Sequence, residues 1–293
     1  MNKLKEFIKK YSDERWNVGF IRNSLDGVMH GEKIKVDWVQ HNERDSWFAD
    51  PFILDVTDNK IILLVEEFYK PIYRGRIARL TIDRNNYQLL SKELVLQLDT
   101  HLSFPVIVRK DDGIYIYPEN GAAGGLWLYK YDVASNKIVR VSQLVNEPVE
   151  DAIVTTLFGG KKMFATKRPY PNGNELFVYD WDDALSRFRL SQSYKFEENV
   201  ARMAGNFFEY NGKIYRPAQE CNTQYGHAVT LQNIVQNDGK FTFKEVRRLY
   251  SVNPKLNVGM HTFNMYKDMI VTDALGFDNM WLRKILSSCG LLH

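Results

Sequence analysis

Acidic residues recur along the sequence at positions where they could act together on one substrate. Four of them are candidate catalytic residues: Asp50, Glu119, Asp151 and Glu220. A pair of carboxyl groups can break or transfer a glycosidic bond, because one protonates the leaving oxygen while the other activates water or attacks the sugar. The acidic residues therefore indicate carbohydrate chemistry.

Polar, basic and aromatic residues close to these acids form a candidate substrate-binding set. Carboxylates accept hydrogen bonds from sugar hydroxyls, and aromatic faces can stack on a pyranose ring. Cationic members would bind an anionic sugar, a phosphate or a sugar nucleotide. The set consists of Trp47, Glu67, His101, Ser103, Lys167, Arg168, Arg202, Arg216, Gln219, Tyr225, His227 and His261.

Several of these residues also have purely structural interpretations. Asp50 could cap a turn before Pro51, and His261 could be a hydrogen-bonded core residue. Glu66 and Glu67 are adjacent, so only one of them can face inward from a strand. In the same way, Glu119 could pair with a nearby arginine, either Arg74 or Arg76.

The elements that must position these residues repeat along the chain. Each repeat begins with a short apolar segment, and these segments are expected at 48–54, 103–108, 151–157, 203–210 and 261–266. After a turn rich in Asn, Asp and Gly, second strands are expected at 60–67, 113–120, 161–168, 212–220 and 268–275. Third strands are expected in four repeats, at 74–83, 125–132, 174–182 and 226–235, and fourth strands include 137–145 and 241–249.

This repeat predicts an all-β fold, a five-bladed β-propeller. The steps between aligned positions are 54, 47, 53 and 57 residues, and a four-stranded propeller blade needs about 40–50. The fifth repeat has no clear outer strands, so the segments at 16–21 and 33–40 are expected to complete it. Such closure removes exposed sheet edges. A β-sandwich or a pair of β-domains is the alternative.

We expect three parts in the chain: an amphipathic helix over residues 1–15, the propeller over 16–278 and a tail over 279–293. Leu4, Phe7, Ile8 and Tyr11 form one apolar stripe at helical spacing, surrounded by lysines. The two ends of the chain either pack on the propeller or provide a peripheral membrane contact. The run GAAGG at 121–125 is expected to be a hairpin connection, since it lacks the residues of a phosphate-binding loop.

Composition excludes several classes of protein. The net charge is only +3, which argues against a dedicated nucleic-acid binder. No apolar run approaches the roughly 20 residues of a membrane-spanning helix, and no secretory signal follows Met1. We therefore expect a cytoplasmic protein, at the inner face of the membrane if the ends bind lipid. The two cysteines, Cys221 and Cys289, do not have the spacing of a zinc site.

The pattern resembles the glycoside hydrolase family 43 propellers. ADPF opens the first repeat, an acidic residue opens the third, and His261 opens the fifth. By this resemblance Asp50 would be the base or nucleophile, and Asp151 would tune pKa values or orient the sugar. His261 would lie near a central divalent cation, although the sequence leaves the cofactor undetermined. The sequence departs from the family at Arg202 or Met203, where the general-acid glutamate is expected, which leaves Glu220 or Glu119 as the acid.

A closer resemblance covers most of the chain. Five segments resemble the N-terminal propeller domain of plant glucosamine inositolphosphorylceramide transferases. They are DSWFADPF (45–52), HLSFP (101–105), YPEN (117–120), GMHTFN (259–264) and the long segment 201–229, which contains RPAQE. Bacterial stand-alone relatives of that domain are associated with surface-polysaccharide synthesis. The resemblance implies a glycan, sugar nucleotide or lipid-linked sugar as partner.

Three functions remain open from the sequence. The first is an enzyme that hydrolyses or transfers a glycosyl unit in cell-surface polysaccharide or glycolipid synthesis, using carboxylates at one rim of the propeller. The second is a non-catalytic propeller that binds a glycan or sugar phosphate beside a glycosyltransferase. The third is an interaction scaffold whose rim binds another protein.

Overall fold

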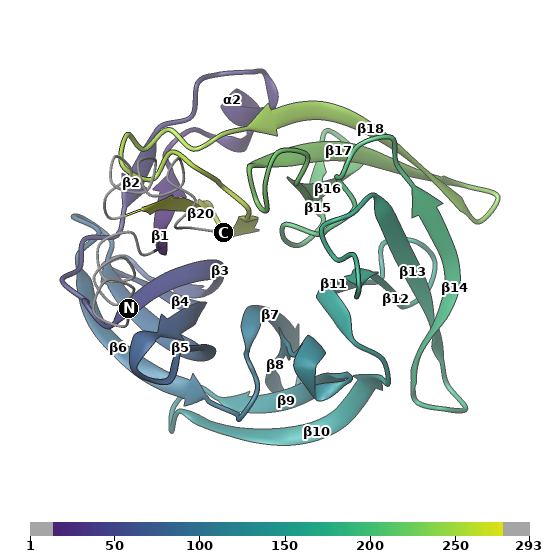
Figure 1. Ribbon diagram of the computed structural model, residues 1–293, viewed down its shortest axis with the longest axis horizontal. Coiled ribbons are helices and arrows are strands. Elements are labelled where there is room, and N and C mark those ends of the chain that lie inside the picture. The colour runs from purple at the N-terminus through teal and green to yellow at the C-terminus, as the bar shows by residue number, and fades with distance from the viewer. Residues whose placement is uncertain (1–13, 278–293) are drawn as a thin grey trace, which may run out of the picture.

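Five four-stranded antiparallel sheets are arranged in a ring around a central axis in the computed structural model, which describes residues 14–277 (Figure 1). The five-bladed propeller predicted from the repeat is therefore confirmed. The expected N-terminal helix and C-terminal tail fall almost entirely outside the described residues, and Glu14 and Arg15 already belong to the first strand. Among the described residues, no helix is long and apolar enough to cross a membrane.

Each of the first four blades is built from consecutive strands, with the first strand innermost. Blade 1 contains β3 (Ser46–Val56), β4 (Lys60–Tyr69), β5 (Arg74–Asp83) and β6 (Leu89–Leu96). Blade 2 contains β7 (Ser103–Lys110), β8 (Gly113–Glu119), β9 (Leu126–Asp132) and β10 (Lys137–Val145). Blade 3 contains β11 (Val149–Thr155), β12 (Lys162–Lys167), β13 (Glu175–Asp182) and β14 (Arg187–Lys195). Blade 4 contains β15 (Phe208–Tyr210), β16 (Lys213–Glu220), β17 (Ala228–Asn237) and β18 (Lys240–Leu249).

Blade 5 closes the ring with strands from both ends of the described chain. Its order is β19 (Phe263–Tyr266), β20 (Met269–Phe277), β1 (Glu14–Ile21) and β2 (Val36–Trp38). Strands β1 and β20 pair without a register shift, from Glu14 opposite Phe277 to Ile21 opposite Ile270. This is the closure expected from the sequence, and it ties the two ends of the propeller together.

Two strands, the inner strand of blade 4 and the outer strand of blade 5, are shorter than predicted. In blade 4 only residues 208–210 form β15, and Met203 contributes a single isolated bridge to Ala218. In blade 5 the predicted strand at 33–40 is reduced to β2. The short helical segments are α2 (Leu25–Met29), η1 (Lys70–Ile72) and η2 (Gly121–Ala123), and the last of these lies in the hairpin connection predicted for GAAGG.

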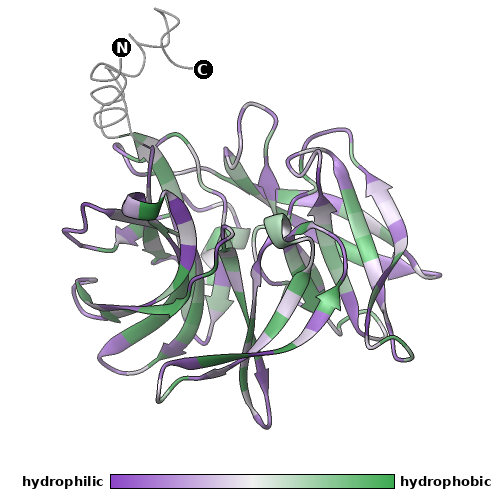
Figure 2. Ribbon diagram, turned by 60° about the horizontal axis from the view of Figure 1, so that its bottom comes forward, coloured by the Kyte–Doolittle hydropathy of each residue, from purple (hydrophilic) through white to green (hydrophobic). Residues whose placement is uncertain are grey.

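Aromatic side chains fill the wedge between neighbouring blades. Between blades 3 and 4, Phe158, Phe164, Phe207 and Phe241 contact one another, with ring centroids 4.9–5.8 Å apart. Burying one such ring stabilises the fold by about 1.5–3 kcal/mol. Figure 2 shows hydrophobic residues along the strands and hydrophilic ones at many of the turns. The high aromatic content therefore serves largely to pack blade against blade.

Candidate functional site

Three inner strands bend sharply where they begin, at the same end of the axis. Asp50, Phe104 and Asp151 have positive φ angles of 50°, 45° and 45°, and each lies within a register shift between the inner strand and its neighbour. A left-handed conformation costs a residue other than glycine about 1–3 kcal/mol, so it persists only where its surroundings enforce it. The three positions are the ones that the sequence repeat aligns, and two of them carry buried aspartates.

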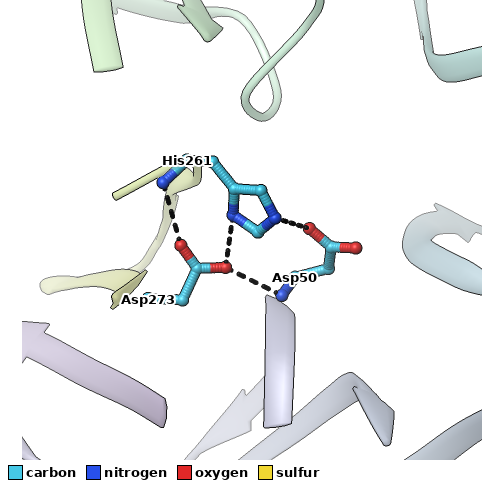
Figure 3. Close-up of side chains that lie close together, drawn as sticks. All are labelled: Asp50, His261 and Asp273. Atoms are coloured by element: carbon cyan, nitrogen blue, oxygen red, sulfur yellow. Dashed lines mark hydrogen bonds and ion pairs between the residues drawn. The ribbon is translucent and has the colours of Figure 1, made fainter. Parts of the chain in front are cut away.

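His261 lies between two buried carboxylates, as Figure 3 shows. Its Nδ1 is 2.8 Å from Asp273 Oδ2, and its Nε2 is 3.5 Å from Asp50 Oδ1. Asp273 also accepts hydrogen bonds from the backbone N–H groups of Asp50, His261 and Thr262 at 3.0–3.1 Å. The three side chains therefore form one hydrogen-bonded group that joins blade 1 to blade 5.

Burial and the neighbouring charges shift the pKa values of these three side chains in different directions. Burial lowers the pKa of His261, but the negative charges of Asp273 and Asp50 outweigh it and raise the pKa to about 9. Burial raises the pKa of Asp50 well above its ordinary range, against the pull of His261. Burial acts on Asp273 in the same direction, but His261 and the backbone donors hold its pKa below the ordinary value. At neutral pH His261 is therefore an imidazolium paired with the Asp273 carboxylate, beside Asp50, whose raised pKa favours its neutral form.

A second buried group surrounds Asp151. Arg202 Nε lies 2.5 Å from Asp151 Oδ2, and Arg202 Nη2 lies 3.3 Å from Glu119 Oε2 and 3.9 Å from Glu150 Oε2. Gln219 Nε2 donates to the same Asp151 oxygen at 2.5 Å. Arg202 thus links carboxylates from blades 2 and 3, and it is itself held by the segment that enters blade 4.

The carboxylates of this second group differ in protonation. Burial, together with the charge of Asp151 and the proximity of Glu150, raises the pKa of Glu119 well above its ordinary value. Burial opposes the ionisation of Asp151 too, but Arg202 holds the pKa of Asp151 below the ordinary value. Glu119 therefore holds a proton more tightly than Asp151 does, and it accepts a hydrogen bond from the Asp151 backbone N–H at 2.8 Å.

Tyr225 covers both groups on the solvent side. Its ring centroid lies 5.0 Å from the Arg202 guanidinium carbon and 5.3 Å from the His261 ring. Tyr225 is 36% exposed, whereas Arg202 and His261 are buried. Trp16 stacks on the other side of His261, with ring centroids 4.0 Å apart. Aromatic rings therefore pack against the charged residues at the axis, Trp16 against His261 and Tyr225 against both His261 and Arg202.

We call the residues that these contacts join the axial cluster. They come from all five blades and lie at the rim predicted from strand starts and strand ends. The cluster consists of Asp50, Glu119, Glu150, Asp151, Arg202, Gln219, Tyr225, His261 and Asp273.

Other predicted residues lie beside the cluster and are more accessible. The His101 side chain is 45% exposed, and its Nε2 lies 3.0 Å from Glu66 Oε1. The Arg168 side chain is 55% exposed, and its Nε lies 2.6 Å from Glu150. Ser103 is buried at the start of β7. His101 and Arg168 therefore offer polar contacts to a ligand at this end of the axis.

Some predicted binding residues are engaged elsewhere. Arg216 is fully buried, donates to the Val200 and Ala201 carbonyls and packs near Phe196 and Phe243, so it cannot reach a sugar. This corrects the expectation that it binds an anionic sugar. The sequence suggested Arg216 because it lies near the end of a second strand, but its side chain turns into the interface between blades.

The structure also corrects the expectation that Glu67 binds the substrate. It binds Ser46, Arg76 and Lys92 at 2.6–2.8 Å, away from the axis. Its neighbour Glu66 is the inward one, because it pairs with Ala49 next to Asp50 and its charge raises the pKa of Asp50.

The remaining predicted residues have contacts of their own. Trp47 stacks on Phe68 with centroids 4.8 Å apart, and His227 lies 5.5 Å from the ring of Tyr250. Glu220 accepts a hydrogen bond from the Asn222 backbone N–H at 2.6 Å. Of the two expected acids, the structure therefore brings Glu119, and not Glu220, into contact with Asp151.

Sequence reasoning missed Asp273, Glu150 and Trp16 as members of the site. Asp273 and Glu150 lie at a strand end and a strand start that the repeat had already marked, so position alone did not distinguish them. Trp16 is supplied by β1, far away in the sequence, and only ring closure reveals it.

Three of the buried side chains could hold a metal ion. Asp50, His261 and Asp273 each offer one ligand atom, and these atoms lie within 4.8 Å of one another. Two carboxylate oxygens and an imidazole nitrogen form a donor set that suits a divalent cation. Metal binding would compete with protons on His261, whose pKa is about 9, and on Asp50, whose pKa is raised. The residues fit such an ion once those protons leave.

Residues 35–271 match the family model of the N-terminal domain described as glucosamine inositolphosphorylceramide transferase 1. Two similar curated proteins carry that transferase name. The one from Oryza sativa subsp. japonica is 26% identical over 210 residues, which cover 69% of this chain and 28% of the relative. The one from Arabidopsis thaliana is 26% identical over 203 residues, which cover 64% and 26%. The chain thus spans only about a quarter of the length of these relatives.

Solved structures with a similar fold are carbohydrate-cleaving enzymes. A family 43 β-xylosidase/α-arabinofuranosidase from a compost microbial metagenome superposes with a TM-score of 0.56 at 11% identity, covering 79% of this chain and 91% of that one. A family 32 β-fructofuranosidase from Bombyx mori superposes with a TM-score of 0.54 at 12% identity, covering 72% and 53%. At this identity the likeness shows the fold alone.

Proposed function

The chain belongs to the family of the glucosamine inositolphosphorylceramide transferase 1 N-terminal domain, and we propose that it is a carbohydrate-active propeller that acts on a glycosyl unit at the axial cluster. The substrate is a cell-surface glycan, a glycolipid or a sugar precursor of one. The reaction is hydrolysis or transfer of that glycosyl unit. The names of the plant relatives and the fold shared with sugar-cleaving enzymes support this choice of substrate class.

One observation carries the proposal: the axial end gathers buried acceptor atoms that lack donors. Among the described residues, Asn120 Oδ1 and Gln219 Oε1 have no hydrogen-bond partner, and Asp50 Oδ1 faces only His261 Nε2, at 3.5 Å. A buried acceptor without a donor costs about 1–3 kcal/mol, so such atoms are normally satisfied by water or by a ligand. A sugar supplies several hydroxyl donors within one ring, which suits this set.

Access to the cluster passes by Tyr225. A sugar first meets the accessible side chains of His101, Arg168 and Tyr225. Movement of the Tyr225 ring away from Arg202 and His261 then opens the buried acids. The displaced ring remains available to stack on the sugar.

The acid and base roles follow from protonation. The raised pKa of Glu119 favours its protonated form, which can donate a proton to the leaving oxygen. Asp151 stays ionised because Arg202 and Gln219 hold it, so it can orient the sugar and stabilise positive charge at the anomeric carbon. Asp50 acts as base or nucleophile only after losing its proton, and His261 is the neighbour that favours this loss. A divalent cation held by Asp50, His261 and Asp273 would keep both carboxylates ionised.

A second function is favoured by one specific observation, the ion pair of Arg202 with Asp151. Arg202 stands where the resemblance to family 43 places the acid, and arginine cannot donate a proton at neutral pH. A propeller with this substitution could bind a glycan or sugar phosphate without converting it, beside a glycosyltransferase. The cationic and acceptor groups at the axis would then serve recognition alone.

Partners and location follow from this function. The partner is a glycan, a sugar nucleotide or a lipid-linked sugar, and we propose that the protein acts in the cytoplasm at the inner face of the membrane. The basic, apolar-striped N-terminal segment 1–13 would provide the peripheral membrane contact. Deleting that segment should then abolish binding to anionic liposomes, and unchanged binding would contradict its role.

Glu119→Gln separates the two functions. The wild type and the variant would be incubated with oligosaccharides and nucleotide sugars, with turnover followed by mass spectrometry and binding by calorimetry. If the protein is an enzyme, Glu119→Gln lowers turnover by about 10²–10⁴-fold and retains binding. Glu209→Gln is the matched control, because Glu209 is exposed on β15. Binding without turnover in the wild type establishes the second function, and no binding to any sugar contradicts both.

A further inference from the structure

A separate cleft opens beside the axial cluster on blade 3. It has a volume of about 730 Å³ and is formed by the hairpin 168–174 between β12 and β13, together with residues near the end of β14. Its lining includes Lys167, Arg168, Lys195 and Asn199, and the proline-flanked Tyr170. Because the hairpin follows the end of a second strand, the cleft lies at the same end of the propeller as the axial cluster.

The lining of the cleft contains three cations, of which Lys167 is paired with Glu147, and one carboxylate, Glu175, opposite Lys195 in the sheet. The excess of positive charge suits an anionic group. Lys195 is exposed, and the Arg168 side chain is 55% exposed with its Nε bound to Glu150. That bond directs the Arg168 guanidinium while much of the side chain remains open to solvent, and arginine forks of this kind bind carboxylate and phosphate oxygens. Asparagine side chains in the lining add neutral donors.

An aromatic ring also stands open at this cleft. Tyr170 is 81% exposed, the highest value among the large hydrophobic side chains described as exposed. An exposed ring between two prolines has little freedom to collapse onto the surface. It therefore offers a face on which a sugar ring can stack, next to the cationic groups.

Two chains of contacts connect the cleft to the axial cluster. Asn172, in the hairpin, accepts a hydrogen bond from Arg202 Nη1 at 2.8 Å. Arg168 binds Glu150, whose other oxygen lies 3.9 Å from Arg202. Arg202 in turn holds Asp151 and Glu119. A ligand could therefore contact the hairpin and the axial cluster at once.

We infer that the blade 3 cleft binds the anionic part of the substrate, a carboxylate or phosphate carried next to the glycosyl unit that occupies the axial cluster. This inference rests on the proposed function and adds the substrate class, an acidic or phosphorylated sugar. Lys195 and Arg168 bind the oxyanion, and Tyr170 stacks on the ring that carries or adjoins it. A neutral oligosaccharide would bring no negative charge to Lys195 or to the exposed part of Arg168, and would bind more weakly.

Calorimetric titration of the full chain with two probes tests the inference. Inorganic pyrophosphate represents the phosphate source and digalacturonate the carboxylate source, and maltotriose is the neutral comparison. We expect at least one anionic probe to bind with a Kd on the order of 1 mM or tighter. Lys195→Gln should weaken that binding by about fivefold or more, and added salt should weaken it in the wild type. The control Lys213→Gln removes an exposed lysine at the opposite end of blade 4 and should leave the affinity for the anionic probe unchanged.

The outcomes separate this inference from the proposed function. Binding of pyrophosphate alone supports a phosphorylated substrate, and binding of digalacturonate alone supports a uronate. Asp50→Asn should leave pyrophosphate binding unchanged, because Asp50 belongs to the axial cluster. No saturable binding of either anion, or equal binding by wild type and Lys195→Gln, overturns the inference even if a neutral sugar binds at the axis.

Discussion

Arg202 Nε lies 2.5 Å from Asp151 Oδ2 in the buried centre of the propeller. The aspartate opens the inner strand region of blade 3, and the arginine opens that of blade 4, so the pair joins two blades at the axis. The arginine stands where related sugar-cleaving folds are expected to carry an acid. The pair therefore fixes the charge of Asp151 and at the same time constrains which residue can donate a proton.

Removing the arginine should destabilise the protein strongly. Arg202→Gln leaves Asp151 buried without its cation, which costs about 3–5 kcal/mol of unfolding free energy for a buried ion pair. Urea unfolding measures this loss. The control Arg189→Gln breaks an ion pair with Asp182 in which the arginine side chain is 68% exposed, and it should cost at most about 1 kcal/mol. Equal losses of unfolding free energy in the two variants would show that the buried ion pair stabilises the fold no more than the exposed one.

Stability should fall at alkaline pH because of His261. Its pKa is about 9 in the folded protein and 6.5 for an unperturbed histidine, a difference worth roughly 3 kcal/mol. The protonated ring contributes this stability in full below pH 6.5, and the contribution is lost as the pH rises through about 9. Unfolding free energies measured from pH 6 to 10 should fall more steeply in the wild type than in His261→Gln. Parallel curves would contradict the raised pKa.

Gly205 should not tolerate a side chain. Its φ is +155°, and an added Cβ would lie 2.2 Å from the Phe263 carbonyl oxygen, where blades 4 and 5 meet. Gly205→Ala should therefore lower the unfolding free energy by more than about 2 kcal/mol. Gly239→Ala is the matched control, because Gly239 also has a positive φ of +76° but no heavy atom within 4 Å of the added Cβ. Gly239→Ala should cost about 1–2 kcal/mol, the penalty of a left-handed conformation for a residue with a Cβ. A milder effect at Gly205 than at Gly239 would refute the close approach.

Tyr225 should matter for sugar binding more than for folding. It is partly exposed and covers Arg202 and His261, so Tyr225→Ala removes the ring on which the sugar stacks. We expect the affinity for the bound sugar to fall about tenfold, or 1.4 kcal/mol. Tyr250→Ala, at another exposed tyrosine on blade 4, should leave the affinity unchanged. Calorimetry on both variants decides the point, and unchanged binding by Tyr225→Ala would remove Tyr225 from the site.

Most of the fold could be predicted from the sequence because each blade repeats the same pattern of apolar strands and polar turns. Strand β10, for example, begins and ends at the expected residues, 137 and 145. The start of strand β15 was predicted less accurately, because Gly205 and the segment around it are bent by contacts with blade 5. Contacts between blades leave no local signal in the sequence.

The sequence predicted where the candidate site lies, but not which side chains contact one another there. Strand starts and ends correctly placed Asp50, Asp151, Arg202 and His261 at one end of the axis. Arg216 and Gln219 are three residues apart in β16, so alternation places them on opposite faces, but it does not predict that one donates to backbone carbonyls between blades and the other binds Asp151. Alternation along a strand gives the face, whereas partners on other blades decide what each side chain contacts.

A crystal structure with a bound oligosaccharide, chosen by screening a glycan array, tests the central claim most directly. We expect a sugar ring at the axial end, in contact with Tyr225, with one of its hydroxyls donating to Gln219 Oε1, which lacks a donor, or to Asp50 Oδ1, which faces His261 Nε2 at 3.5 Å. A sugar bound instead at the opposite end, among the hairpin turns at 57–60 and 110–113, with the axial cluster unchanged, would contradict it.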